Sequence, residues 1–155
     1  MSVKYRRLST PELEELKDEF IKFLAANTVT GPDWVKMKKE EAPKAEAMID
    51  TFSDLVMQKV LEKIEYIEHR ESKTWWMFHC KMESIIMLHI TSKEGVDIDF
   101  LDAESMKKIE DVPVSLHRAE KAYNTTREQE VFDMLQKGCV ITDDQIFKIL
   151  DDAND

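Results

Sequence analysis

The chain has 155 residues and a formal net charge of −10 at pH 7, with 43% apolar and 35% charged residues. This length and composition are sufficient for one compact core, so the sequence predicts a single domain over residues 1–155. The acidic surplus repels nucleic acid and anionic membranes, and no apolar run approaches the roughly eighteen residues of a membrane span.

The cysteines and the first residues of the chain indicate a compartment. Cys80 and Cys139 are the two cysteines, and so few thiols fit a reducing compartment better than a disulfide framework. The basic start of the chain is not followed by the apolar segment of a secretory signal. The sequence therefore predicts a cytoplasmic protein.

The first third of the chain has the capping signals and the apolar spacing of helices. Thr10 is expected to cap the first helix, with Pro11 at its first position. Asp33, after a Gly-Pro break, is expected to cap a short second helix. Pro43 opens a longer helix, whose apolar residues form a broad stripe that faces the core: Met48, Ile49, Phe52, Leu55, Val56, Val60 and Ile64.

After residue 64 the apolar pattern changes to that of strands. Three short segments rich in aromatic and β-branched residues, 64–70, 74–80 and 85–91, are separated by polar turns. They predict a three-stranded antiparallel meander, and the segment 95–100 is a candidate for a brief fourth strand. The predicted buried core includes Phe20, Leu24, Phe52, Val56, Phe78 and Leu88.

Helical patterns return in the last third of the chain. Helices are expected over 102–110, over 114–122 and from Thr126 onward. Gly138 has the position of a C-terminal cap, after which a short connection leads to a last helix. The predicted fold class is therefore α+β, an antiparallel meander of three or four strands packed with several helices.

Residues 73–90 concentrate two tryptophans, two histidines and a cysteine. A turn in the middle of the second hairpin pairs the strands so that Trp76 lies opposite His89, and a turn at 71–73 puts Glu68 beside Trp76. Ordinary packing in a sheet explains these residue types, and so does a small-molecule pocket or an interaction surface. The candidate residues for such a site are Glu68, Trp75, Trp76 and His89.

A transition metal would need three or four ligands that converge on one point. In the predicted register Cys80 and His89 share one face but lie about four residue pairs apart, roughly 13 Å at the strand rise. His69 and His79 share the opposite face, at opposite ends of their strands. We therefore expect no metal and no other cofactor.

Other chemical motifs are incomplete. The acidic segment 97–104 resembles a calcium loop, but Leu101 and Asp102 stand where an EF-hand needs a ligand and a glycine. Residues 126–155 have the length of a helix-turn-helix, but they carry three basic and eight acidic side chains, which disfavours DNA binding. The motifs of serine hydrolases, phosphate-binding loops and zinc proteases are absent, although a cysteine nucleophile with a distant histidine would leave no sequence motif. No catalytic residue is predicted, and a non-enzymatic role is favoured.

The two middle strands are apolar on both sides, unlike strands that have one face in water. Helices are expected on both faces, or on one face with a protein partner or a second copy of the chain on the other. Two functions follow. The first is a non-catalytic cytosolic interaction or regulatory protein whose contacts are apolar rather than salt-driven. The second is a small-molecule-binding or enzymatic domain with a pocket near the central sheet.

The runs KYRRLSTPELEELKDEFIKFLAANTVTGPDWVK and TREQEVFDMLQKGCVIT resemble a small bacterial family, found in Bacteroidetes-type genomes and described only as a domain of unknown function. The resemblance covers nearly the whole chain. It implies a free-standing bacterial cytosolic protein, and it brings no activity, cofactor or catalytic residue with it.

Overall fold

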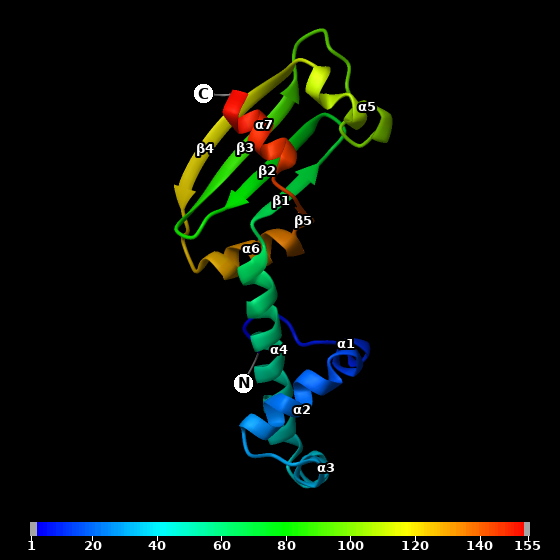
Figure 1. Ribbon diagram of the computed structural model, residues 1–155, viewed down its shortest axis with the longest axis vertical. Helices are drawn as coiled ribbons and strands as arrows, with labels where there is room; N and C mark the ends of the chain where they lie inside the picture. Colours follow the sequence, from blue (N-terminus) through cyan, green and yellow to red (C-terminus); the bar gives the residue numbers. More distant parts are fainter. Residues whose placement is uncertain (1–2, 154–155) are drawn as a thin grey trace. The chain divides into compact units, whose positions relative to one another are not determined.

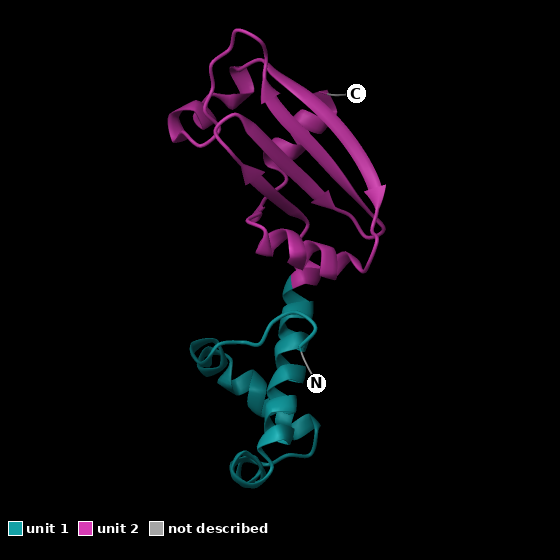
Figure 2. Ribbon diagram, turned by 180° about the vertical axis from the view of Figure 1, so that it is seen from behind, with its two compact units in different colours: residues 1–60 teal, residues 61–155 magenta. Residues whose placement is uncertain are grey.

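The computed structural model describes residues 3–153. These residues form two compact units, one that ends at Val60 and one that begins at Leu61 (Figure 2). A compact unit does not by itself amount to an independently folding domain, so the single domain expected from the sequence stays a prediction.

The first unit consists of helices (Figure 1). Three of them are short: α1 (Thr10–Glu15), α2 (Lys17–Ala26) and α3 (Gly31–Glu40). The fourth, α4 (Ala42–Lys63), is long, and its residues from Leu61 onward belong to the second unit.

The cap of α1 is Ser9, one residue before the predicted position, and the cap of α3 is Thr30, three residues before the predicted position. The Ser9 hydroxyl accepts a hydrogen bond from the Glu12 backbone N–H, and the Glu12 carboxylate accepts one from the Ser9 N–H. Thr30 and Asp33 make the same reciprocal pair of bonds at the start of α3. The predicted cap Thr10 is therefore the first residue of its helix and Asp33 the third, because this arrangement needs an acidic residue three positions after the cap.

The core of the first unit is aromatic. The ring of Phe52 on α4 lies 5.0 Å from that of Phe20 and 5.4 Å from that of Phe23, both on α2. The buried stripe of α4 is narrower than predicted, because Leu55 and Val60 are 48% and 46% exposed. Among the predicted core residues of the whole chain, Leu24, Phe52 and Leu88 are buried, and Phe20, Val56 and Phe78 are partly exposed.

The second unit is built on a five-stranded antiparallel sheet (Figure 1). The three predicted strands are present as β1 (Tyr66–Arg70), β2 (Thr74–Cys80) and β3 (Ser84–Ser92). They form a meander, extended on one side by β4 (Val114–Ala122) and on the other by β5 (Val140–Thr142), in the order β4-β3-β2-β1-β5. The α+β class is confirmed, with more strands than the three or four predicted.

The fourth strand is not where the sequence indicated. Residues 95–100 form no strand, and 114–122, predicted as a helix, pair with β3 over their whole length. The helix formers at 118–122 led to the wrong prediction, whereas Val114 and Leu116 have the two-residue spacing of a strand. Pairing with a neighbouring strand outweighs a weak helix propensity.

The register of the first hairpin differs from the prediction by one residue. Trp76 lies opposite His89 as expected, but Glu68 lies opposite Met77, and His69 takes the place beside Trp76. The turn has two central residues rather than three, because the Glu71 N–H bonds the Thr74 carbonyl at 2.8 Å. A shift of one residue moves every side chain of β1 to the other side of the sheet.

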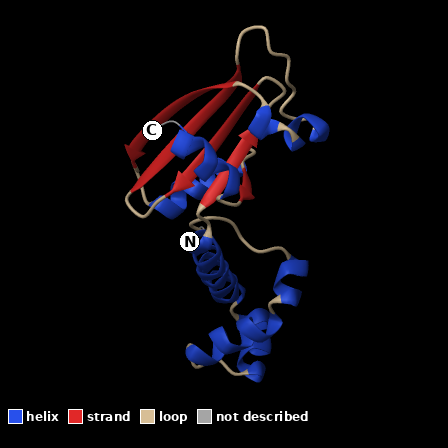
Figure 3. Ribbon diagram, turned by 45° about the horizontal axis from the view of Figure 1, so that its top comes forward, coloured by secondary structure: helices blue, strands red, loops and turns tan. Residues whose placement is uncertain are grey.

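One side of the sheet, called here the covered face, carries Trp75, Met77, Leu88 and Ile90, all at most 1% exposed. The helix α7 (Gln145–Ala153) lies across it (Figures 1 and 3). The connection from β3 to β4, with α5 (Ala103–Lys107) and the 3₁₀ turn Ile109–Asp111, completes the cover. This layer contains the main core of the unit.

The opposite side, called here the open face, carries Trp76, Phe78, Met87 and His89, all partly exposed. The helix α6 (Arg127–Gln136) crosses one end of this face, as Figure 2 shows from behind. Gly138 follows α6 with a positive φ of 116°, which is the predicted C-terminal cap. Within the second unit, helices therefore lie on both faces, but α6 leaves part of the open face uncovered.

Candidate functional site

A groove runs along α6 on the open face. It consists of two adjoining depressions of about 420 and 360 Å³, which share Phe78, Met87, Met134 and Lys137. Phe78 and Met87 come from the neighbouring strands β2 and β3 and form the floor, and Met134 and Lys137 belong to α6 and the turn after it. The groove is therefore a mainly apolar slot between a sheet and a helix.

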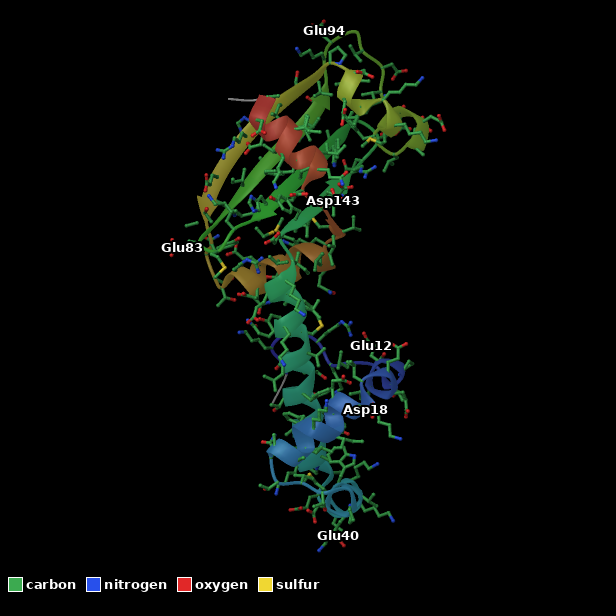
Figure 4. All side chains as sticks on the ribbon, in the orientation of Figure 1. Glu12, Asp18, Glu40, Glu83, Glu94 and Asp143 are labelled. Atoms are coloured by element: carbon green, nitrogen blue, oxygen red, sulfur yellow. The ribbon has the colours of Figure 1, made fainter. Side chains whose placement is uncertain are left out.

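Charged side chains of both signs line this groove. Lys121 on β4 and Lys137 are basic, and Glu71 in the first turn of the sheet, with Glu130 and Asp133 on α6, is acidic. Two further acidic residues of the unit, Glu83 and Glu94, lie in turns and point away from the two ends of the sheet (Figure 4). The net negative charge of the chain is therefore not concentrated in the groove.

A row of aromatic rings continues the groove across the open face, and two of its rings, His69 and Trp76, line the second depression. The Trp76 ring stacks on His89 with centroids 5.0 Å apart and on His69 with centroids 5.7 Å apart. His117 on β4 lies next to His89 in register. Because an imidazole covers each face of the Trp76 indole, this row presents ring edges to its surroundings.

The predicted site residues separate into two pairs. Trp76 and His89 are brought together, as expected. Glu68 and Trp75 lie on the covered face, where the Glu68 carboxylate accepts a hydrogen bond of 2.7 Å from Arg70 and the Arg70 guanidinium lies 5.3 Å from the centre of the Trp75 ring. A pocket lined by Glu68, Trp76 and His89 is thus ruled out by the register.

Two buried side-chain nitrogen atoms have no hydrogen-bond partner within residues 3–153. They are Trp75 Nε1 and His89 Nε2, and both are shielded from solvent. Because neither atom reaches the surface, neither can bind a ligand from solution without a rearrangement of its neighbours. The rings of the aromatic row are partly exposed, but these two nitrogen atoms are not available to a ligand.

Both cysteines are held as thiols. Cys80 is 3% exposed, and burial raises the pKa of its thiol to about 11. Burial also raises the pKa of Cys139, which borders the groove. A thiol nucleophile needs the opposite shift, toward a lower pKa. Across residues 3–153, no three His, Cys, Asp or Glu side chains are grouped to hold a metal ion.

Arg127 fixes the position of α6, and sequence reasoning missed it. Its guanidinium donates hydrogen bonds to the backbone carbonyls of Leu61 at 3.0 Å, of Cys80 at 3.2 Å, and of Ile64. These bonds join the start of α6 to the end of α4 and to the end of β2. No sequence signal exists for such a contact, because any residue can supply a carbonyl.

The sequence partly indicates which residues of α6 border the groove. The spacing of Val131, Met134 and Leu135 predicts one inward side of the helix, and Val131 is fully buried. Met134 and Leu135 are partly exposed, which places them at the margin of the packed surface. The sequence indicated the helix side but not its incomplete cover.

Among the described residues, no helix has the length and apolarity needed to cross a membrane.

Comparisons with known proteins identify the family of the chain. No curated protein and no solved structure is detectably similar to the chain. A family model matches residues 1–155, as the resemblance predicted, and the chain belongs to the family of unknown function DUF6495.

Proposed function

We propose that the protein is a non-catalytic cytoplasmic interaction protein that binds a partner protein in the groove of the open face. One observation carries the proposal: Trp76, Phe78 and Met87 are partly exposed on neighbouring strands beside α6, while the equivalent positions of the covered face are buried. Exposed apolar side chains that adjoin one another are typical of interaction surfaces.

An amphipathic helix of the partner is the element that fits this groove. The face of a sheet offers side chains and no free backbone groups, so an added strand cannot pair with it. A helix laid beside α6 would bury Phe78 and Met87 and would bring polar side chains to Lys121, Glu130 and Asp133 at the margin.

A flat small-molecule ligand fits the same surface less well. Stacking needs an accessible aromatic face, and both faces of Trp76 are covered by histidine rings. The shielded Nε2 atom of His89 offers no hydrogen bond to a ligand from solution. These observations favour a protein partner over the small-molecule alternative.

Site-specific photocrosslinking tests the proposal. A photoreactive amino acid replaces Met87 in the groove, and in a matched variant it replaces Ile149, which is 47% exposed on α7. Crosslinking in the native host is expected to give a covalent adduct with one other protein from position 87 and none from position 149. A purified helical peptide from that protein should then bind the wild-type chain, and the Met87→Glu variant should bind it at least tenfold more weakly.

Equal adducts from both positions, or none from position 87, would contradict the proposal. Binding of the peptide that is unchanged by Met87→Glu would place the partner elsewhere on the chain. Circular dichroism of Met87→Glu is the control, because a folded variant shows that the loss of binding is local.

A further inference from the structure

The strand β4 forms an outer edge of the sheet over nine residues (Figures 1 and 3). It pairs with β3 on one side, and residues 117–122 are all exposed. The other edge of the sheet is β5, with three residues. A long edge strand is a template for pairing with another chain, and proteins usually block it.

The hydrogen-bond pattern of the sheet shows which residues of β4 face outward. The Cys80 N–H bonds the Glu65 carbonyl at 2.7 Å, so the even-numbered residues of β2 bond β1. Because the bonded side alternates along a strand, the odd-numbered residues of β3 and β4 bond each other. Leu116, Glu120 and Ala122 therefore direct their backbone N–H and C=O away from β3.

We propose that two copies of this chain form a homodimer by antiparallel pairing of β4 with β4, with Ala119 opposite Ala119 on the two-fold axis. The outward-facing even positions then pair with one another, as the ladder requires. In this register Arg118 lies opposite Glu120 of the second copy, and the symmetry repeats the pair. The small side chain of Ala119 fits the close approach at the axis.

The charges of β4 select this register among its neighbours. A shift centred on Arg118 would set Arg118 opposite itself, and a shift centred on Glu120 would set Glu120 opposite itself. A shift centred on His117 would put Arg118 opposite Leu116 and leave no ion pair. Like charges directly opposite one another destabilise a sheet, and opposite charges stabilise it. The charges that would repel an arbitrary strand are thus complementary to a second copy.

The dimer would join two sheets into one of ten strands, and the two open faces would become continuous. This inference goes beyond the proposed function, because the groove binds its partner whether or not the edge is paired. Within one chain, Arg118 also bonds Asp151 at 2.8 Å and lies 3.7 Å from Glu120, and Glu120 bonds Ser84 at 2.6 Å and Lys81 at 3.2 Å. A substitution at either position therefore needs a control for folding.

Sedimentation equilibrium of the full chain tests the dimer. The expected mass is twice the 18.2 kDa of one chain, with a concentration-dependent return to monomer. The Glu120→Arg variant should raise the dissociation constant roughly tenfold or more, because both ion pairs become repulsive. The double variant Arg118→Glu with Glu120→Arg restores opposite charges in the same register and should recover the dimer. Glu104→Arg on α5, 74% exposed in its side chain, makes the same charge change away from the edge and should have no effect.

Amide hydrogen exchange locates the contact. In a β4 dimer the amides of Leu116 and Glu120 become protected as concentration rises, and those of His117 and Ala119 are protected throughout by β3. A monomer at every concentration would overturn the proposal. So would a dimer in which the Leu116 and Glu120 amides stay unprotected, or one that the folded Glu120→Arg variant forms equally well.

Discussion

Arg127 is the residue whose burial has the clearest energetic consequence. It is 8% exposed, and each of its three carbonyl partners lies where a backbone element ends. A buried carbonyl that loses its partner costs about 1–3 kcal/mol. The guanidinium is also favourably placed at the negative C-terminal end of α4.

Substitution Arg127→Met keeps the length of the side chain and removes its donors. We expect the free energy of unfolding to fall by about 3 kcal/mol, because several buried carbonyls lose a charged donor. The matched control is Lys107→Met on α5, where the side chain is 71% exposed. This substitution should change the free energy of unfolding by less than about 0.5 kcal/mol. Urea unfolding measures both, and equal small effects would show that the carbonyls find other partners.

His79 gives the second unit a dependence on pH. Its ring stacks on Tyr66 with centroids 4.4 Å apart and meets Phe147 edge-on at 5.7 Å. Burial lowers the pKa of His79 below its ordinary value of 6.5, and this effect exceeds the opposing influence of Glu65. The neutral imidazole is therefore the form that the fold favours.

The sign of the pH effect follows from that lowered pKa. His79 is protonated more readily in the unfolded chain than in the folded one. The stability that neutral His79 contributes is therefore fully present above about pH 6.5, and it is lost as the pH falls toward the lower pKa of His79 in the folded state. We expect the free energy of unfolding to fall between pH 7.5 and 5.5, and to fall less in His79→Phe, which keeps the ring contacts. Urea unfolding at both pH values measures the difference. An identical pH dependence in the variant would mean that other groups cause it.

At the scale of elements, the helix α4 has one buried side and one exposed side. Phe52 packs on two phenylalanines, and Leu55, three residues later, is half exposed. We expect Phe52→Ala to lower the free energy of unfolding by about 3–5 kcal/mol, through lost burial and a cavity. Leu55→Ala on the same helix should cost less than about 1 kcal/mol, because little buried surface is removed. Thermal unfolding compares the two, and an unchanged melting temperature for Phe52→Ala would contradict the packing of the first unit.

At the scale of the whole molecule, the candidate metal ligands are dispersed. Cys80 and His89 are on the open face, opposite Ile85 and Trp76 respectively, and His79 is on the covered face beside Tyr66. We therefore expect the melting temperature to be unchanged by EDTA. Elemental analysis of the purified protein is the independent check, and stoichiometric zinc or a chelator-induced drop would contradict this placement.

The dependence of self-association on salt distinguishes between the two contact surfaces that we propose. Contacts through the apolar groove are expected to be insensitive to salt, whereas the ion pairs of β4 weaken as the Debye length falls to about 3 Å at 1 M. Light scattering at rising protein concentration, at low and at high salt, tests this for self-association. Self-association that weakens at 1 M salt indicates pairing through β4. Self-association that persists or strengthens indicates an apolar surface. A monomer at every concentration and salt would exclude self-association through either surface.

The sequence by itself determined the α+β class, the three central strands and the pairing of Trp76 with His89, because these depend on local patterns and on one short turn. The tertiary structure decided the rest. A two-residue turn set the register that moved Glu68 to the other face, and pairing with β3 made a strand of residues 114–122. The incomplete cover of the open face depends on where α6 is held by Arg127, through carbonyls that no sequence pattern marks. Register, edges and cover arise from contacts between residues far apart in the chain, which a single sequence does not encode locally.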